Sequence, residues 1–143
     1  MFLIKNIKCE YVERPIAITT MKPRFSWEIS SEQNNIYQKA YKIKVENEKG
    51  NIIWNSGKIE SRNSIGIVYD GELLDSCNRY YYSVKVWDKN GNTVESNIEC
   101  FETAFLKASD WKAKWIEPNP LPQLAENPLV TAQNKFMTFI KAM

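Results

Sequence analysis

The residues from Arg79 to Asp88 constrain the fold of this 143-residue chain more than any other stretch. The even positions from Tyr80 to Val86 carry tyrosine and valine, while the odd positions carry polar or charged side chains together with Tyr81 and Trp87. A period of two in β-branched and aromatic residues predicts a half-buried antiparallel strand. We therefore expect a central strand here, with the rest of the chain arranged around it.

Leu74 and Tyr80 stand six positions apart just ahead of this strand, with the small or polar residues Ser76 and Asn78 between them. The spacing resembles the tyrosine corner of fibronectin type III and immunoglobulin-like sandwiches. In that corner, a tyrosine near the start of a central strand directs its hydroxyl back to the backbone of the preceding crossover. On this resemblance Tyr80 is the corner residue; the alternative is an ordinary tyrosine-rich strand.

Further short strands are predicted wherever apolar residues alternate between turn signals. The predicted strands cover residues 2–11, 24–30, 38–48, 52–55, 64–69, 79–88 and 93–103. In the second, Phe25, Trp27 and Ile29 should point inward, and Ser26 and Glu28 outward. Asn90-Gly91 is a strong signal for a two-residue hairpin turn. About seven strands without an amphipathic helix predict an all-β fold, an antiparallel immunoglobulin-like or fibronectin type III-like β-sandwich.

The pattern of strands ends near residue 106. We therefore place the sandwich at residues 1–106 and expect an irregular linker or tail at residues 107–143, leading toward a further domain. Prolines mark the later part of the tail as extended; they are Pro118, Pro120, Pro122 and Pro128.

Composition excludes several classes of function. The net charge is only +2 and the basic residues are dispersed, which argues against nucleic-acid and membrane partners. The apolar stretch at the N-terminus is too short for a signal peptide, so a cytoplasmic location is expected. The three cysteines lack metal-type spacing, and there is no histidine, the commonest general base and metal ligand. We expect no cofactor and no metal.

Five motifs occur in the order in which they appear in one known family. They are Pro23-Arg24-Phe25-Ser26-Trp27, Ile53-Trp54-Asn55-Ser56-Gly57-Lys58-Ile59, Tyr80-Tyr81-Tyr82-Ser83-Val84-Lys85-Val86-Trp87-Asp88, Phe101-Glu102-Thr103 and Asp110-Trp111-Lys112-Ala113-Lys114-Trp115-Ile116. Together they resemble the N-terminal region of bacterial α-L-rhamnosidases, inverting enzymes of glycoside hydrolase family 78. The resemblance covers residues 20–117, and the tail beyond fits the family poorly.

The resemblance implies a sandwich domain without catalytic residues. Members of the family are long, multidomain enzymes that remove terminal α-L-rhamnose with acidic residues in an (α/α)6 barrel, and this chain has no counterpart of that barrel. Inversion needs two facing carboxyl groups about 6.5–9.5 Å apart. The acidic residues here fall mostly at outward strand positions or in turns, as a solvated face requires; examples are Glu28, Glu46, Glu48, Asp70 and Asp88.

We therefore expect a non-catalytic accessory domain that positions its neighbours in an α-L-rhamnosidase-like protein. A carbohydrate-binding module and a protein–protein interaction domain are the alternatives, since fold alone does not decide between them. For sugar stacking, with rhamnose-containing glycans as ligands, the candidates are Trp54, Tyr81 and Trp87, which we expect on outward faces. The alternative for these rings is packing against a neighbouring strand or domain.

Trp111, Trp115 and Ile116 are the candidates for domain docking. Trp111 and Trp115 stand four apart, so they share one face in a strand or a helix, with Lys112 and Lys114 facing away. A one-sided aromatic surface of this kind usually marks a contact. We expect it to meet the next domain or, by self-association, a second copy of the chain. The alternative is that both rings fold back onto their own sandwich.

Overall fold

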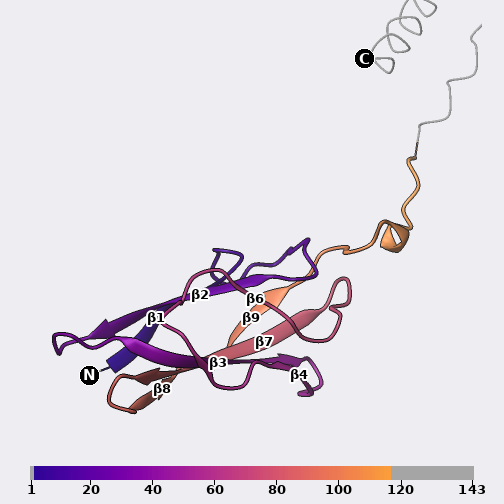
Figure 1. Cartoon of the computed structure of the whole chain (residues 1–143). Helices are drawn as coiled ribbons and strands as arrows, with labels where there is room; N and C mark the ends of the chain where they lie inside the picture. Colours follow the sequence, from indigo (N-terminus) through magenta and orange to yellow (C-terminus); the bar gives the residue numbers. More distant parts are fainter. Residues whose placement is uncertain (1, 117–143) are drawn as a thin grey trace, which may run out of the picture. The chain divides into compact units, whose positions relative to one another are not determined.

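Nine strands and one short 3-10 helix form in the computed structural model, which describes residues 2–116 (Figure 1). The strands are β1 (Phe2–Cys9), β2 (Arg24–Ser31), β3 (Gln38–Asn47), β4 (Ile52–Asn55), β5 (Ile59–Glu60), β6 (Ile67–Val68), β7 (Arg79–Asp88), β8 (Thr93–Glu95) and β9 (Glu99–Glu102). The 3-10 helix η1 covers Ala108–Asp110. Within this described part of the chain, no helix is long and apolar enough to cross a membrane.

The strands form two antiparallel sheets (Figure 1). One has the order β1-β2-β6; the other has the order β4-β3-β7-β8, with β5 also on β3 and β9 also on β7. The longest pairing joins β3 to β7, from Gln38 opposite Asp88 to Asn47 opposite Tyr80. The predicted antiparallel all-β sandwich is confirmed, and β7 is its central strand.

Two predicted strands, at residues 64–69 and 93–103, differ most from the observed ones. Residues 93–103 form β8 and β9 with a break between them. At this break, the side chain and the backbone of Ser96 both bond Val84 of β7. The Val84 N–H donates to Ser96 Oγ at 2.9 Å, and the Ser96 N–H donates to the Val84 carbonyl at 2.8 Å. Of residues 64–69, only Ile67–Val68 pair as a strand, since Gly66 lies in the left-handed region at φ +67°.

The chain divides into two compact units, Met1–Lys112 and Ala113–Met143. The first unit therefore includes η1, whereas the sequence pattern places residues 107–143 in the tail. Residues 117–143, with their four prolines, lie outside the described residues.

The core lies between the sheets and is rich in aromatic rings. Its buried residues are Cys9, Ile18, Phe25, Trp27, Tyr41, Ile43, Val45, Ile67, Tyr69, Leu74, Tyr80, Tyr82, Val84, Val86 and Phe101. The Trp27 indole N–H donates to Gln38 Oε1 at 2.9 Å, and Gln38 Nε2 donates to the carbonyls of Ser61 and Asn63, each at 2.9 Å. Burying the indole therefore leaves its N–H paired, as buried polar groups require.

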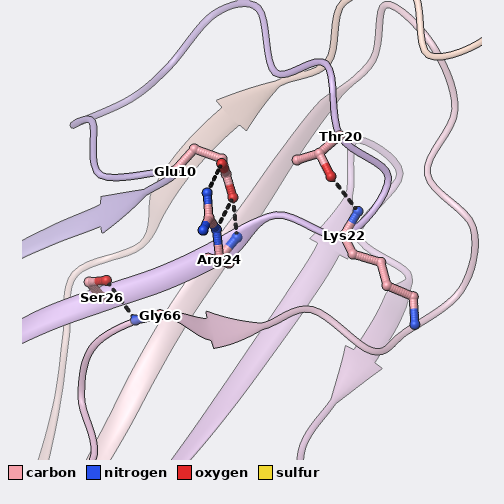
Figure 2. A network of polar contacts seen from close by, with 6 residues as sticks. All are labelled: Glu10, Thr20, Lys22, Arg24, Ser26 and Gly66. Carbon is pink, nitrogen blue, oxygen red and sulfur yellow. Dashed lines mark hydrogen bonds and ion pairs between the residues drawn. The ribbon is translucent and has the colours of Figure 1, made fainter.

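Ser26 is a correction to the predicted pattern of β2, because it is buried rather than exposed. Its side chain is only 9% exposed, and Ser26 Oγ accepts a hydrogen bond from the Gly66 N–H at 3.1 Å (Figure 2). The loop before β6 covers this part of β2. Alternation indicates which side of the sheet a residue faces, but here a loop covers the outer side.

An ion pair joins the end of β1 to the start of β2 (Figure 2). The Glu10 carboxylate accepts hydrogen bonds from Arg24 Nε at 3.2 Å, Arg24 Nη2 at 3.0 Å and the Arg24 backbone N–H at 2.7 Å. The side-chain bond with Arg24 lowers the pKa of Glu10. Glu10 and Tyr11 have positive φ values of 49° and 64°, so this turn has a conformation that non-glycine residues rarely adopt. The bonds to Arg24 hold it in place.

Asp88 is a second correction, since it is 2% exposed and does not lie on a solvated face. Asp88 Oδ1 accepts hydrogen bonds from the N–H groups of Asn90 and Asn92, and Asp88 Oδ2 accepts one from Asn92 Nδ2, all at 2.8 Å. The carboxylate thus organises a four-residue loop, 89–92, in which Gly91 supplies the positive φ of 87°. The hairpin forms, but the prediction of a two-residue turn at Asn90-Gly91 is therefore wrong.

Asp88→Asn is expected to destabilise the domain in a pH-dependent way. Burial alone raises the pKa of Asp88, but the hydrogen bonds from Asn92 and Asn90 outweigh it, so the pKa lies below the usual 3.8. A lowered folded-state pKa stabilises the protein above the unfolded pKa, and this contribution is lost as the pH falls through the folded value. The difference in unfolding free energy between parent and variant should be constant from pH 7 to about 5 and shrink below about 4. Urea denaturation across this range measures it, and a pH-independent difference would contradict the assignment.

Candidate functional site

Tyr80 begins β7 and bonds the loop that precedes it. The Tyr80 hydroxyl accepts a hydrogen bond from the Asp75 backbone N–H at 2.8 Å. Leu74 and Tyr80 are buried, and the Tyr80 ring stacks on Phe101 of β9 at a centroid distance of 5.3 Å. The structure thus places Leu74 and Tyr80 in the geometry of a tyrosine corner.

The corner loop is also bonded to the end of β9 through Thr103. Thr103 Oγ1 donates to the Asp75 carbonyl at 2.5 Å and accepts from the Asn78 N–H at 3.1 Å. The Thr103 N–H donates to the Asn78 carbonyl at 2.9 Å. On the other side, Ile18 of the N-terminal segment donates its N–H to the Glu102 carbonyl at 2.9 Å. The end of β9, from which the chain leaves the sandwich, is therefore held by the corner loop on one side and by the N-terminal segment on the other.

Ser76 fixes the residues that follow, which we call the exit segment (residues 104–111). The Leu106 N–H donates to Ser76 Oγ at 2.8 Å, and the Ser76 hydroxyl donates to Asp110 Oδ2. Asp110 Oδ2 also accepts from the Lys107 N–H at 3.1 Å. Two polar side chains from distant parts of the sequence thus hold η1 against the corner loop.

The exit segment presents an aromatic pair, Phe105 and Trp111. The two rings meet edge to face, with centroids 5.6 Å apart and an interplanar angle of 77°. They remain 47% and 61% exposed, respectively. Of the predicted docking residues, Trp111 therefore belongs to the first compact unit, while the exposed side chains of Trp115 and Ile116 belong to the second.

Trp54 does not lie on an outward face, which corrects its expected placement. Its ring packs against the core residues Phe25 and Tyr69, at centroid distances of 6.1 and 5.1 Å. The reason is its register: Trp54 pairs with the inward residue Val45 of β3. The ring remains half-buried, and the surface that contacts Phe25 and Tyr69 is not available to a sugar.

Tyr81 and Trp87 are half-buried and occupy odd positions of β7, on the opposite side from its core-facing residues. Lysine ammonium groups lie over the Trp87 ring, Lys58 at 5.0 Å and Lys85 at 5.5 Å from its centroid. Cation–π contacts of this length attract both ammonium groups to the ring. The three predicted sugar-stacking residues therefore do not form one platform, because Trp54 faces the core.

The described residues do not bring metal ligands together, and their cysteines are not paired. No three of their cysteine or carboxylate side chains gather closely enough to hold a metal ion. Cys9, Cys77 and Cys100 are free thiols, and burial raises the pKa of Cys9 strongly, which keeps that thiol protonated and unreactive.

Comparison with known proteins identifies the domain. Residues 4–107 match the family model of the Rha78A-like, N-terminal immunoglobulin domain. The chain belongs to this family. It is 38% identical over 120 residues to an α-L-rhamnosidase of Streptomyces avermitilis, covering 80% of this chain and 12% of that protein. It is 40% identical over 110 residues to an α-L-rhamnosidase of Formosa agariphila, covering 71% and 12%.

Solved structures agree with the assignment to the Rha78A-like immunoglobulin family. The Streptomyces avermitilis α-L-rhamnosidase, crystallised with L-rhamnose, matches with a TM-score of 0.77 and 34% identity over 82% of this chain and 12% of that one. The Dictyoglumus thermophilum α-L-rhamnosidase matches with a TM-score of 0.74 and 30% identity, covering 80% and 14%. The chain thus spans about an eighth of these relatives, and the part it matches is a non-catalytic N-terminal domain.

Sequence reasoning missed the residues that fix the exit segment. Ser76 was noted only as a small residue of the corner spacing, and Phe105 lay at the end of the predicted sandwich without a role. The one available signal was the position of Thr103 and Asp110 within the family motifs, which marks them but gives no partner for either. Their bonds to the corner loop become visible only in three dimensions.

Proposed function

We propose that this domain is the N-terminal accessory part of an α-L-rhamnosidase-like protein and that it positions a neighbouring domain. The relatives are α-L-rhamnosidases, and the chain corresponds to their N-terminal immunoglobulin domain. Its proposed role is mechanical: it offers a contact surface at a fixed place and takes no part in bond cleavage.

The observation that carries this proposal is the exposed Phe105–Trp111 pair on an exit segment that Ser76 holds in place. Two large rings exposed beside each other form an apolar surface of the kind that marks contacts. Because η1 is bonded to the corner loop, this surface is already ordered before it meets a partner. Preordering reduces the entropy lost on docking.

Trp111 is expected to lose solvent access in a longer protein that carries the proposed neighbouring domain after this one. The contribution of Trp111 to fluorescence is obtained by subtracting the spectrum of Trp111→Phe from that of the parent. In the chain of residues 1–143 this contribution should be quenched readily by acrylamide, since the ring is 61% exposed. In the longer protein it should shift to the blue and resist quenching.

Trp87→Phe provides the matched control, because Trp87 lies on β7, away from the exit segment. Its contribution should be the same in both proteins. Equal quenching of Trp111 in the two proteins, without loss of stability of the longer one on Phe105→Ala, would refute the docking. A second copy of the chain as the occupant would instead appear as concentration-dependent dimerisation of residues 1–143, abolished by Trp111→Ala.

A further inference from the structure

Positive charge gathers at one end of the six-stranded sheet, where β3 begins and β7 ends. Lys42 of β3 pairs in register with Lys85 of β7, which on its other side pairs with Glu95 of β8, so two cations and one carboxylate share this row on the solvent side of the sheet. We call the whole group the cationic face; its members are Lys39, Lys42, Lys58, Arg62, Lys85 and Lys89. Within the described part of the chain, none of the six forms an ion pair with a carboxylate.

The first ring of the cationic face is Tyr37, just before β3. The Arg62 guanidinium carbon lies 3.9 Å from the centre of the Tyr37 ring, and the Lys89 ammonium lies 5.8 Å from it. A shallow pocket of about 430 Å³ opens beside them; it is lined by Tyr37, Lys39, Glu60, Ser61, Arg62 and Lys89. Glu60 is the only acidic residue among these, against three cations, so the pocket carries a net positive charge.

Hydrogen bonds from the core hold one wall of this pocket. Gln38 Nε2 donates to the backbone carbonyls of Ser61 and Asn63, which flank Arg62. Gln38 itself is 3% exposed and is bonded to the Trp27 indole. The backbone that carries the guanidinium is therefore fixed from the interior, and Arg62 is not simply a charge on a free loop.

Trp87 is the second ring, and Lys58 and Lys85 lie over it. Trp87 pairs in register with Ala40 of β3, which on its other side pairs with Glu60 of β5. Glu60 also lines the pocket at Tyr37, so this row of paired residues across β7, β3 and β5 connects the second ring to the pocket beside the first. Each ring thus carries two cations that have no carboxylate partner among the described residues.

We propose that the cationic face binds an acidic polysaccharide through the carboxylates of its uronic acid units. The planar guanidinium of Arg62 presents a donor fork that matches a carboxylate in two-point fashion. The Tyr37 ring, over which Arg62 lies, is still 37% exposed and offers its remaining apolar surface to the C–H groups of a sugar. Unpaired cations held close together repel one another, and a bound carboxylate relieves that repulsion. This site is independent of the docking surface on the exit segment.

Charge distribution favours this ligand over a nucleic acid. Nucleic-acid backbones are bound along a continuous basic track, with affinity that rises with the number of phosphates contacted. Here the whole chain has a net charge of only +2, and the cations gather around two separate rings. The two separate groups of cations, around Tyr37 and around Trp87, suit a polysaccharide that carries a single carboxylate on each sugar unit.

The test is titration of the chain with tetragalacturonate, followed by isothermal calorimetry and by backbone amide NMR shifts. Binding should shift the amides of residues 37–39, 58–62 and 85–89. Arg62→Gln with Lys89→Gln should weaken binding about tenfold or more, because both charge-assisted contacts with the carboxylates are lost. Tyr37→Leu should also weaken binding, because the flat ring is lost.

Lys5→Gln with Lys8→Gln is the matched control, because it removes the same charge from β1 in the other sheet. It should leave the affinity unchanged, and the methyl ester of tetragalacturonate should not bind. Equal loss of affinity in the control variant would show non-specific attraction and overturn the proposal. Equal binding of the neutral ester, or tighter binding of single-stranded DNA with the same number of charges, would overturn it as well.

Discussion

Gly71→Ala is expected to lower the free energy of unfolding by about 3 kcal/mol, near the upper end of the usual range for overpacking. A Cβ atom at residue 71 would lie 2.5 Å from Trp54 Cβ, 2.6 Å from the Tyr69 hydroxyl oxygen and 2.7 Å from the Ile53 carbonyl oxygen. All three distances are shorter than real Cβ contacts, and two of the three atoms belong to the backbone or lie next to it. The neighbours therefore cannot move aside by a simple rotation of a flexible side chain.

Hydrogen bonds at the turn around Gly71 connect β4 to the segment between β6 and β7. The Glu72 N–H donates to the Ile53 carbonyl at 3.1 Å, and the Tyr69 hydroxyl donates to the Glu72 carbonyl at 2.7 Å. An added methyl group has to push these bonded partners apart. The effect of Gly71→Ala should therefore appear as a lower urea midpoint with an unchanged m value.

Gly57→Ala is the control, because it separates steric crowding from backbone strain. A Cβ at residue 57 would meet nothing within 4 Å, but the backbone there has φ +67°. Alanine at such a φ costs about 1 kcal/mol. If Gly71→Ala proves no more destabilising than Gly57→Ala, the close approach of Gly71 to Trp54 and Ile53 does not limit packing.

The strands that sequence predicted best are those with one buried and one exposed face. The alternation in β3 and β7 gives both their extent and their inward residues, because the core lies on one side only. Ser26 and Asp88 were misplaced for different reasons. The loop before β6 covers Ser26 from the outer side, whereas Asp88 shares the inward phase of β7 and is buried by its bonds to the loop that follows. Whether a loop folds over a sheet depends on tertiary contacts, which a period of two does not contain.

The two surfaces to which we assign proposed roles were only partly predictable, because they too depend on tertiary contacts. Trp111 follows from its spacing and aromatic character, but its neighbour Phe105 and the anchor between Ser76 and Asp110 do not. That anchor joins residues 34 positions apart. The cationic face is similarly assembled from β3, β7 and the loop around Arg62. Its charges look dispersed in the sequence and come together only when β3 pairs with its neighbours.

Tyr80→Phe and Tyr82→Phe are expected to have different effects although both remove a hydroxyl from β7. Tyr80→Phe should lower the free energy of unfolding by about 1–3 kcal/mol, since the Asp75 N–H loses its partner while the ring stays buried on Phe101. Tyr82→Phe should be neutral or stabilising. The Tyr82 hydroxyl is buried without a hydrogen-bond partner among the described residues, so its removal ends a desolvation cost.

The two variants control for each other because their rings have similar surroundings. Tyr82 is 1% exposed and Tyr80 is 3% exposed, and both rings contact Phe101. Loss of hydroxyl volume is therefore common to both, and the hydrogen bond to Asp75 is the difference between them. Urea denaturation should place the midpoint of Tyr80→Phe below that of Tyr82→Phe with equal m values. Equal midpoints would mean that the bond to Asp75 does not stabilise the corner, whatever its length.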